Sequence, residues 1–177
     1  MGDWVIEPAT VEALPDILQI EEACFSAPWT RKMLEAELSG NPFAHFLLAK
    51  RVTPGEAGSV PIVGYLCFWI VFEEVRLMNL AVIESMRHKG IAKALVIQAL
   101  ETGIAQAAVR TVLEVRASNQ AAQALYRSLG FRDVTTRRAY YTNPIEDALL
   151  MELDPIVSES GRLTYEIGRD GGRVRPL

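Results

Sequence analysis

The sequence predicts an α/β (α+β) domain built on one mixed, mostly antiparallel sheet. Its 177 residues suit a single domain with its own core. Strand-like and helix-like segments alternate between residues 76 and 129, which favours locally parallel strands. Strand-like segments follow one another directly on both sides of that stretch, which favours antiparallel pairing. The predicted order is strand, two helices, three strands, helix, strand, helix and two strands.

Apolar periodicity and turn residues define the elements of the first half. A short strand is expected at 4–6 and a helix at 14–25, with Glu21 and Glu22 on its polar face. Thr30 can cap a second helix that runs to residue 38. The strands expected at 46–50 and 62–72 are joined by a loop of turn-forming residues at 52–59.

The second half continues with a strand and a broadly apolar helix. A further strand precedes a helix with apolar residues at positions 122, 125, 126 and 129, which Gly130 can end. Two strands close the domain. The predicted segments are 76–82, 90–102, 111–116, 119–129, 134–140 and 148–153. We therefore assign residues 1–156 to the domain and expect the polar, glycine-rich residues 157–177 to form a mobile tail.

Composition excludes several classes of protein. The formal net charge is −4, whereas a general nucleic-acid binder usually carries a basic surplus. The only histidines are His45 and His88, so we expect no metal site. Cys24 and Cys67 lie among apolar residues, as expected of buried free thiols in a reducing cytoplasm. The start lacks a signal-peptide pattern, and the apolar stretch at 62–72 is too short to span a membrane.

The connection from residue 87 to residue 92 has the chemistry of a phosphate-binding turn. It links a strand to a helix start, where unpaired backbone N–H groups and the helix dipole favour an anion. Gly90 lacks the Cβ atom that would keep a phosphate away, and Arg87 and Lys89 add positive charge. Taken alone, the motif is equally explained by a glycine at a strand-to-helix turn.

A carboxylate and a phenol follow this turn. Strand alternation places Glu114 opposite the apolar Leu113 and Val115, where a carboxylate could act as a general base. The alternative is a solvated residue or a partner for Arg116. Tyr126 lies on the apolar stripe of its helix, so it is either a core residue or a proton donor that faces a cavity. Asn119 either caps that helix or holds a ligand.

These residues occur together in a combination that resembles the GNAT acetyltransferases. The motifs are Arg87-x-x-Gly90-x-Ala92, Leu113-Glu114-Val115-Arg116-x-x-Asn119 and Ala124-Leu125-Tyr126-x-x-x-Gly130-Phe131. More narrowly, the chain resembles bacterial ribosomal-protein-alanine N-acetyltransferases, over roughly residues 4 to 154. That similarity rests on Cys24-Phe25-Ser26-Ala27-Pro28-Trp29-Thr30, Asn79-Leu80-Ala81-Val82, Arg137-Arg138-Ala139-Tyr140-Tyr141 and Glu146-Asp147-Ala148.

The resemblance implies a GNAT fold: a six- to seven-stranded sheet with helices on both faces and a V-shaped split between the central parallel strands. It implies acetyl-CoA as co-substrate, with Glu114 as base and Tyr126 as acid, and no metal. The implied cofactor contacts come from Leu80, Ala81, Val82, Arg87, His88, Lys89, Gly90, Ile91, Ala92 and Asn119.

The acceptor that the resemblance implies is a protein N-terminus, first of all the N-terminal alanine of a small-subunit ribosomal protein. The segment from Phe25 to Thr30 could form one wall for the peptide, and Tyr140 and Tyr141 could clamp it from a late loop or simply pack on the sheet. Three alternatives stay open: another amine acceptor, such as a lysine or a small molecule; a domain that binds acyl-CoA and signals without catalysis; and a plain nucleotide-binding domain, although no G-x-G-x-x-G motif is present.

Overall fold

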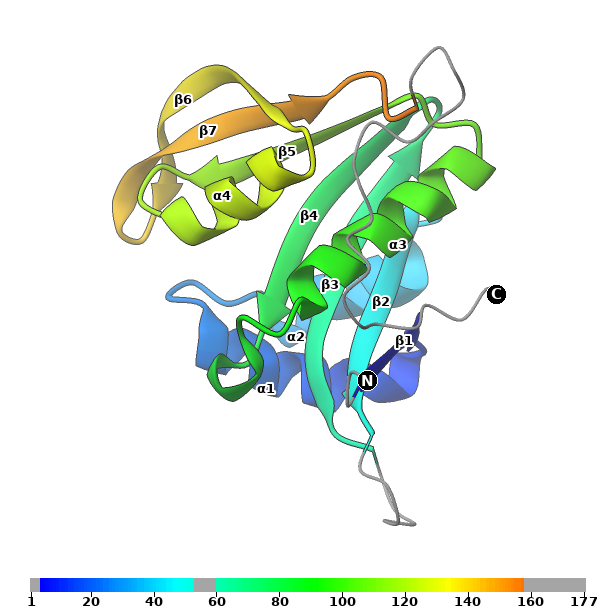
Figure 1. The fold of residues 1–177 in the computed structure, drawn as a ribbon. Coiled ribbons are helices and arrows are strands. Elements are labelled where there is room, and N and C mark those ends of the chain that lie inside the picture. Colours follow the sequence, from blue (N-terminus) through cyan, green and yellow to red (C-terminus); the bar gives the residue numbers. More distant parts are fainter. Residues whose placement is uncertain (1–3, 53–59, 158–177) are drawn as a thin grey trace. The chain divides into compact units, whose positions relative to one another are not determined.

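The computed structural model describes residues 4–52 and 60–157. Its seven strands form one sheet in the order β1-β2-β3-β4-β5-β7-β6 (Figure 1). The expected loop at 52–59 and the expected tail at 157–177 lie outside the described residues, except for their first residues, 52 and 157. The chain consists of two compact units. The first contains the described parts of 1–68 and 79–99, and the second contains 69–78 and 100–157.

The sheet is mixed, as the sequence predicts. β4 (Glu74–Val82) pairs in parallel with β5 (Arg110–Arg116), whereas β5 and β6 (Arg132–Thr142) each pair antiparallel with β7 (Ile145–Leu153). The β4–β5 ladder joins residues 74–77 to residues 110–113, and both strands continue beyond it. A ladder that ends before its strands do is expected where the sheet splits.

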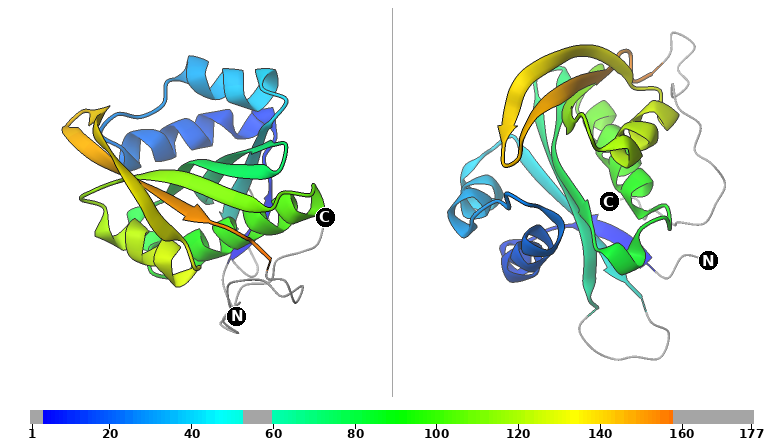
Figure 2. Two further views of the ribbon diagram at one scale, coloured as in Figure 1. Left: turned by 90° about the horizontal axis from the view of Figure 1, so that it is seen from above. Right: turned by 90° about the vertical axis from the view of Figure 1, so that its left-hand side faces the viewer.

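The first unit has helices on both faces of its strands. Those strands are β1 (Trp4–Pro8), β2 (Ala44–Arg51), most of β3 (Ile62–Val71) and the end of β4, with β1 antiparallel to β2. α1 (Leu14–Cys24) and α2 (Arg31–Glu35) cover one face, and the start of α3 (Ile91–Ala105) covers the other (Figure 2).

The core of the first unit forms where α1 meets the sheet. The helix buries residues spaced by three, Leu14, Ile17 and Ile20, against Phe46 and Leu48 of β2. Burial of one apolar stripe, rather than intrinsic helix propensity, is what stabilises a helix of this length.

The second unit contains β5, β6, β7 and α4 (Gln120–Ser128). β5 alternates as expected, with Leu113 and Val115 buried and Glu114 and Arg116 half-buried. Leu113 is paired with Met151 of β7, which is also fully buried. The apolar face of β5 is therefore buried together with β7, and Glu114 and Arg116 lie on the opposite face of the strand.

The hairpin of β6 and β7 is longer than the sequence predicts. The expected strands were 134–140 and 148–153, but pairing extends to Thr142 and Ile145. Tyr140 and Tyr141 consequently lie in β6 and not in a loop. Both are aromatic residues that favour strands, and only Asn143 and Pro144 remain to make the turn.

Candidate functional site

The turn between β4 and α3 has the backbone shape that a left-handed residue imposes. His88 and Gly90 have φ values of 60° and 78°, and α3 begins directly after them, with the Ala94 N–H donating to the Gly90 carbonyl at 3.0 Å. A positive φ favours glycine. No atom lies within 4 Å of the position that a Cβ of Gly90 would occupy. The turn therefore presents an open, exposed helix start.

Two cationic side chains belong to this turn. Arg87 Nε donates to the Val82 carbonyl at 3.1 Å, which ties the turn to the end of β4. Lys89 Nζ lies 3.4 Å from the sulfur of Met86. Arg87, His88 and Lys89 are exposed, while Ile91 is buried and Ala92 is half-buried. An anion at the helix start would thus meet two positive charges and free backbone donors.

The strand that leads into this turn is held in place from the α1 side. Leu80 is half-buried, and Ala81 and Val82 are buried. The Val82 carbonyl also accepts from the Cys24 thiol, whose sulfur lies 3.7 Å away. Of the predicted cofactor contacts, the structure therefore brings Leu80–Val82 together with Arg87 in the first unit.

Glu21 differs from its expected place on a polar helix face, because its side chain is fully buried. Its carboxylate accepts hydrogen bonds from the Tyr65 hydroxyl, from Asn79 Nδ2 at 2.7 Å and from the Trp29 N–H at 2.6 Å. Burial raises the pKa of Glu21, and these donors act in the opposite direction. Its position four residues after Ile17, on the apolar stripe, was the signal in the sequence.

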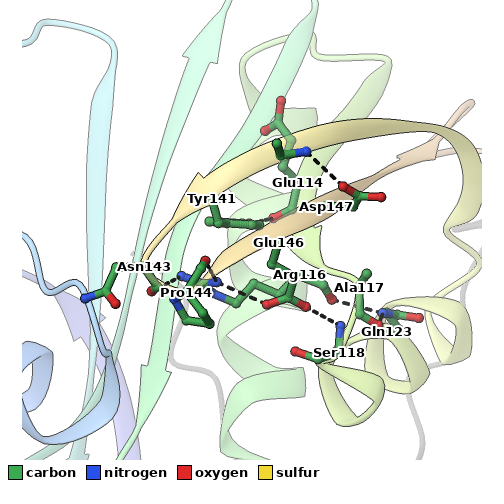
Figure 3. A network of polar contacts seen from close by, with 11 residues as sticks. Glu114, Arg116, Ala117, Ser118, Gln123, Tyr141, Asn143, Pro144, Glu146 and Asp147 are labelled. Atoms are coloured by element: carbon green, nitrogen blue, oxygen red, sulfur yellow. Dashed lines mark hydrogen bonds and ion pairs between the residues drawn. The ribbon is translucent and has the colours of Figure 1, made fainter.

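Glu114 belongs to a polar cluster on the second unit. Its Oε1 lies 3.1 Å from Arg137 Nη1 of β6, and its side chain is 28% exposed. The alternative of an ion pair with Arg116 is wrong, since Arg116 pairs instead with Glu146 at 3.1 Å. Tyr141 donates its hydroxyl to the backbone carbonyl of Glu114 at 3.4 Å, which joins β6 to β5 (Figure 3).

Arg116 holds the tip of the β6–β7 hairpin (Figure 3). Its guanidinium donates to the carbonyls of Asn143 at 3.0 Å and Pro144 at 3.4 Å, and it lies 4.1 Å from the centre of the Tyr141 ring. The Glu146 carboxylate also accepts the Ser118 N–H at 2.5 Å. The contacts with Ser118 and Arg116 lower the pKa of Glu146. The tip is therefore fixed by a charged fork and a cation–π contact.

The two tyrosines at this tip differ in exposure. Tyr140 is 46% exposed and meets Tyr141 edge-on, with ring centres 5.2 Å apart. Burial raises the pKa of Tyr141 to about 12. Arg137 lies 5.6 Å from the Tyr140 ring centre, so the same arginine contacts Glu114 and an exposed aromatic ring.

Tyr126 lies in the core and Asn119 caps a helix, which is the simpler of the two interpretations that the sequence allows for each. Tyr126 is 7% exposed and packs against Phe131 with ring centres 5.6 Å apart. Burial, with a smaller effect of Tyr141, raises the pKa of its phenol, so the hydroxyl stays protonated at neutral pH. Asn119 caps α4 by accepting the Ala122 N–H at 3.1 Å. In the first unit, Phe25 is half-buried against the core beside α1.

The part of the chain that the structure describes has neither a metal-binding cluster nor a membrane-crossing helix. No group of three or more histidine, cysteine, aspartate or glutamate side chains that could hold a metal ion occurs in residues 4–52 and 60–157. None of the helices in this part of the chain is long and apolar enough to cross a membrane.

Comparison with known proteins agrees with this arrangement. The acetyltransferase (GNAT) family pattern matches residues 14–131. A ribosomal protein bS18-alanine N-acetyltransferase of Escherichia coli K12 is 34% identical over 142 residues, covering 79% of this chain and 90% of its own.

Solved structures agree as well. The crystal structure of the ribosomal-protein-S18-alanine N-acetyltransferase from Escherichia coli has a TM-score of 0.74 and 27% identity, covering 94% of this chain and 97% of its own. NAA60 of Arabidopsis thaliana in complex with acetyl-CoA, at 20% identity, has a TM-score of 0.77 over 85% of this chain and 98% of its own, which shows the same fold.

Replacement of Arg116 tests whether it holds the hairpin tip. Arg116→Met keeps a long side chain but removes the fork, so the Asn143 and Pro144 carbonyls lose their donor. Hydrogen bonds to charged groups contribute about 1.5–3 kcal/mol each. We expect faster backbone hydrogen exchange at 139–147 and a melting temperature lower by several degrees.

The matched control is Arg127→Met. Its ion pair with Asp133, at 2.8 Å, is exposed by 45% on both sides. Such surface pairs contribute little, so this variant should melt within about two degrees of the parent. Equal effects of the two substitutions would contradict the role of Arg116.

Proposed function

The chain belongs to the acetyltransferase (GNAT) family and is an acetyl-CoA-dependent N-acetyltransferase, and we propose that it acetylates the N-terminal α-amine of a protein in the cytoplasm. The first substrate that we propose is the N-terminal alanine of a small-subunit ribosomal protein. The observation that carries this is the 34% identity over 79% of the chain to an enzyme named for that substrate. We treat residues 1–156 as the acetyltransferase domain.

In this proposal the turn at 87–92 binds the pyrophosphate of acetyl-CoA. The open start of α3, the left-handed Gly90 and the cations Arg87 and Lys89 support it. Residues 80–82 supply backbone groups to the pantetheine arm and to the oxyanion. The phosphate turn is lined by His88, Ile91 and Ala92, and Asn119 adds a cofactor contact at the start of α4.

Glu114 is the base and Tyr126 the acid. An α-amine has a pKa near 8 and is mostly protonated at neutral pH, so a carboxylate must take its proton before the nitrogen attacks the thioester carbonyl. Tyr126 then protonates the departing thiolate, after which Glu114 releases its proton to solvent and the phenolate is reprotonated. The half-buried position of the Glu114 side chain on β5 supports its role.

Tyr140, Tyr141 and Phe25 are the residues we assign to the acceptor peptide. Tyr140 is exposed at a hairpin tip that Arg116 holds, which gives it a defined place. We assign Tyr141 to hold the hairpin tip and Tyr140 in place, because its ring contacts Arg116 and its hydroxyl donates to the Glu114 backbone carbonyl. Phe25 is half-buried, so we expect only its exposed edge to contact a peptide.

A pH–rate profile separates the base from the acid. Glu114→Gln should lower turnover by roughly 10²–10⁴-fold near neutral pH, with part of the rate returning at high pH, where more free amine exists. Tyr126→Phe keeps the packing on Phe131, so any effect on rate reports the loss of the hydroxyl. Turnover should fall, and the loss relative to the parent should grow as pH rises, because solvent then supplies fewer protons. Initial rates on one α-amine peptide from pH 6 to 9 measure both effects.

Arg137→Gln is the control for the lost ion pair, since it breaks the contact with Glu114 but leaves the carboxylate. It should retain much more activity than Glu114→Gln. Near-parental rates for Glu114→Gln would remove the base assignment. A small, pH-independent effect of Tyr126→Phe would return that residue to the core.

The phosphate turn is tested by Gly90→Asn. Asparagine tolerates a left-handed backbone better than other side chains, so the fold should persist while the new side chain fills the open space beside the turn. Stabilisation by acetyl-CoA, read as a melting-temperature shift, should largely vanish, because linkage requires ligand binding to the native state. A folded variant with the parental shift would be incompatible with this assignment.

The acceptor is tested with paired peptides. One has a free N-terminal alanine and an internal lysine, and the other has the same sequence with a blocked N-terminus. The lower pKa of an α-amine leaves far more of it unprotonated than a lysine near pH 7.5. Mass spectrometry should find acetyl only on the free N-terminus. Acetyl on lysine, or on neither peptide, would favour another amine acceptor or a non-catalytic acyl-CoA sensor.

A further inference from the structure

Glu21 is a buried carboxylate to which the proposed mechanism assigns no task. It lies in α1 with 0% of its surface exposed. The ion pairs of the described residues involve other acids, so hydrogen bonds alone compensate its charge. A buried charge is costly unless it is well hydrogen-bonded, and an apolar side chain would fill this position more cheaply. This cost needs a reason outside simple packing.

The two oxygens of Glu21 connect different segments. Oε1 accepts from the Tyr65 hydroxyl of β3 and from Asn79 Nδ2 of β4, and Asn79 also reaches the Tyr65 oxygen at 2.9 Å. Oε2 accepts the backbone N–H of Trp29 at 2.6 Å. One carboxylate thus joins the strand that leads into residues 80–82 to the segment between α1 and α2.

That segment, residues 25–29, is an arch with fixed ends. The side chains of Phe25 and Trp29 pack against the core beside α1, while Ser26, Ala27 and Pro28 are exposed. Cys24 is tied to the Val82 carbonyl, and Thr30 caps α2 by accepting the Met33 N–H at 3.3 Å. The Glu21 carboxylate contacts the backbone of the arch at Trp29.

We propose that Glu21 is a positioning residue for the acceptor peptide: it holds the 25–29 arch in the shape that receives the acceptor N-terminus and sets that arch relative to Asn79 in β4. The inference rests on the proposed function and assigns Glu21 no contact with the reacting atoms. Holding a binding loop in its bound shape removes an ordering cost from association. Loss of Glu21 should therefore weaken peptide binding more than acetyl-CoA binding.

Hydrogen exchange at the Trp29 amide reports the contact directly and does not depend on activity. In Glu21→Leu, the Trp29 N–H loses its acceptor, and its protection should fall by about tenfold or more, as for a hydrogen bond to a charged group. In Glu21→Gln, the amide oxygen can still accept from Trp29 while the Tyr65 hydroxyl and the Asn79 amide reorient, so protection should largely return. Glu21→Asp, which falls one methylene short, replaces Glu21→Leu should that variant not fold.

Steady-state kinetics supplies the functional arm. In Glu21→Leu or Glu21→Asp, the KM for an alanine-initiated peptide should rise by about tenfold and the KM for acetyl-CoA by less than about twofold. Glu21→Gln should lie close to the parent. Glu22→Gln, which changes the exposed neighbouring acid on the same helix, should match the parent in both KM values and in Trp29 protection.

The outcomes separate the two proposals. Unchanged Trp29 protection in Glu21→Leu or Glu21→Asp overturns the inference whatever the activity is. Lost protection with an unchanged peptide KM, or with equal rises in both KM values, makes Glu21 a structural residue only and also overturns it. Absence of acetyl transfer to any peptide by the parent enzyme overturns the proposed function instead, and the positioning role with it, while the Trp29 result still decides whether the contact exists.

Discussion

The short parallel ladder between β4 and β5 is the constraint on which the other features depend. Parallel strands cannot be joined by a tight turn, so the chain must leave β4, cross through a helix and return to β5. That crossover is α3, which follows β4 after a connection at 83–90 and starts at the exposed turn at Gly90. It also makes β5 an interior strand, with antiparallel β7 on its other side. The candidate anion site and the strand that carries Glu114 are both consequences of this topology.

The candidate site residues keep their positions because buried polar groups are matched to donors and acceptors. Glu21 meets only neutral donors, whereas Arg116 meets two carbonyls, a carboxylate and an aromatic ring. Removing one member of either network leaves buried donors or acceptors without a partner, which is costly. What these networks add is a single geometry for the segments they join, which is the property that a site for two substrates requires.

Much of the fold could be predicted from the sequence, because apolar periodicity reports burial directly. The alternation of Leu113, Glu114 and Val115 and the stripe of α1 are examples. Sequence alone places Glu21 wrongly, because an acidic residue type predicts a polar face, and only the partners Tyr65, Asn79 and Trp29 make a buried carboxylate tolerable. The β6–β7 tip was also missed, because Arg116 fixes it from another strand. Long-range polar contacts leave no periodic signal.

Glu114 and Tyr126 lie in different surroundings within one unit. Glu114 is half-buried on β5, with its carboxylate 3.1 Å from the Arg137 guanidinium. Tyr126 packs against Phe131, and burial raises the pKa of its phenol. If the two residues act as proposed, each must work against these surroundings: Glu114 must part from Arg137 before it takes a proton, and a phenol with a raised pKa is a weaker acid. Catalytic contacts often form only when the substrates are bound, so the ion pair with Arg137 describes the free chain and not the complex that reacts.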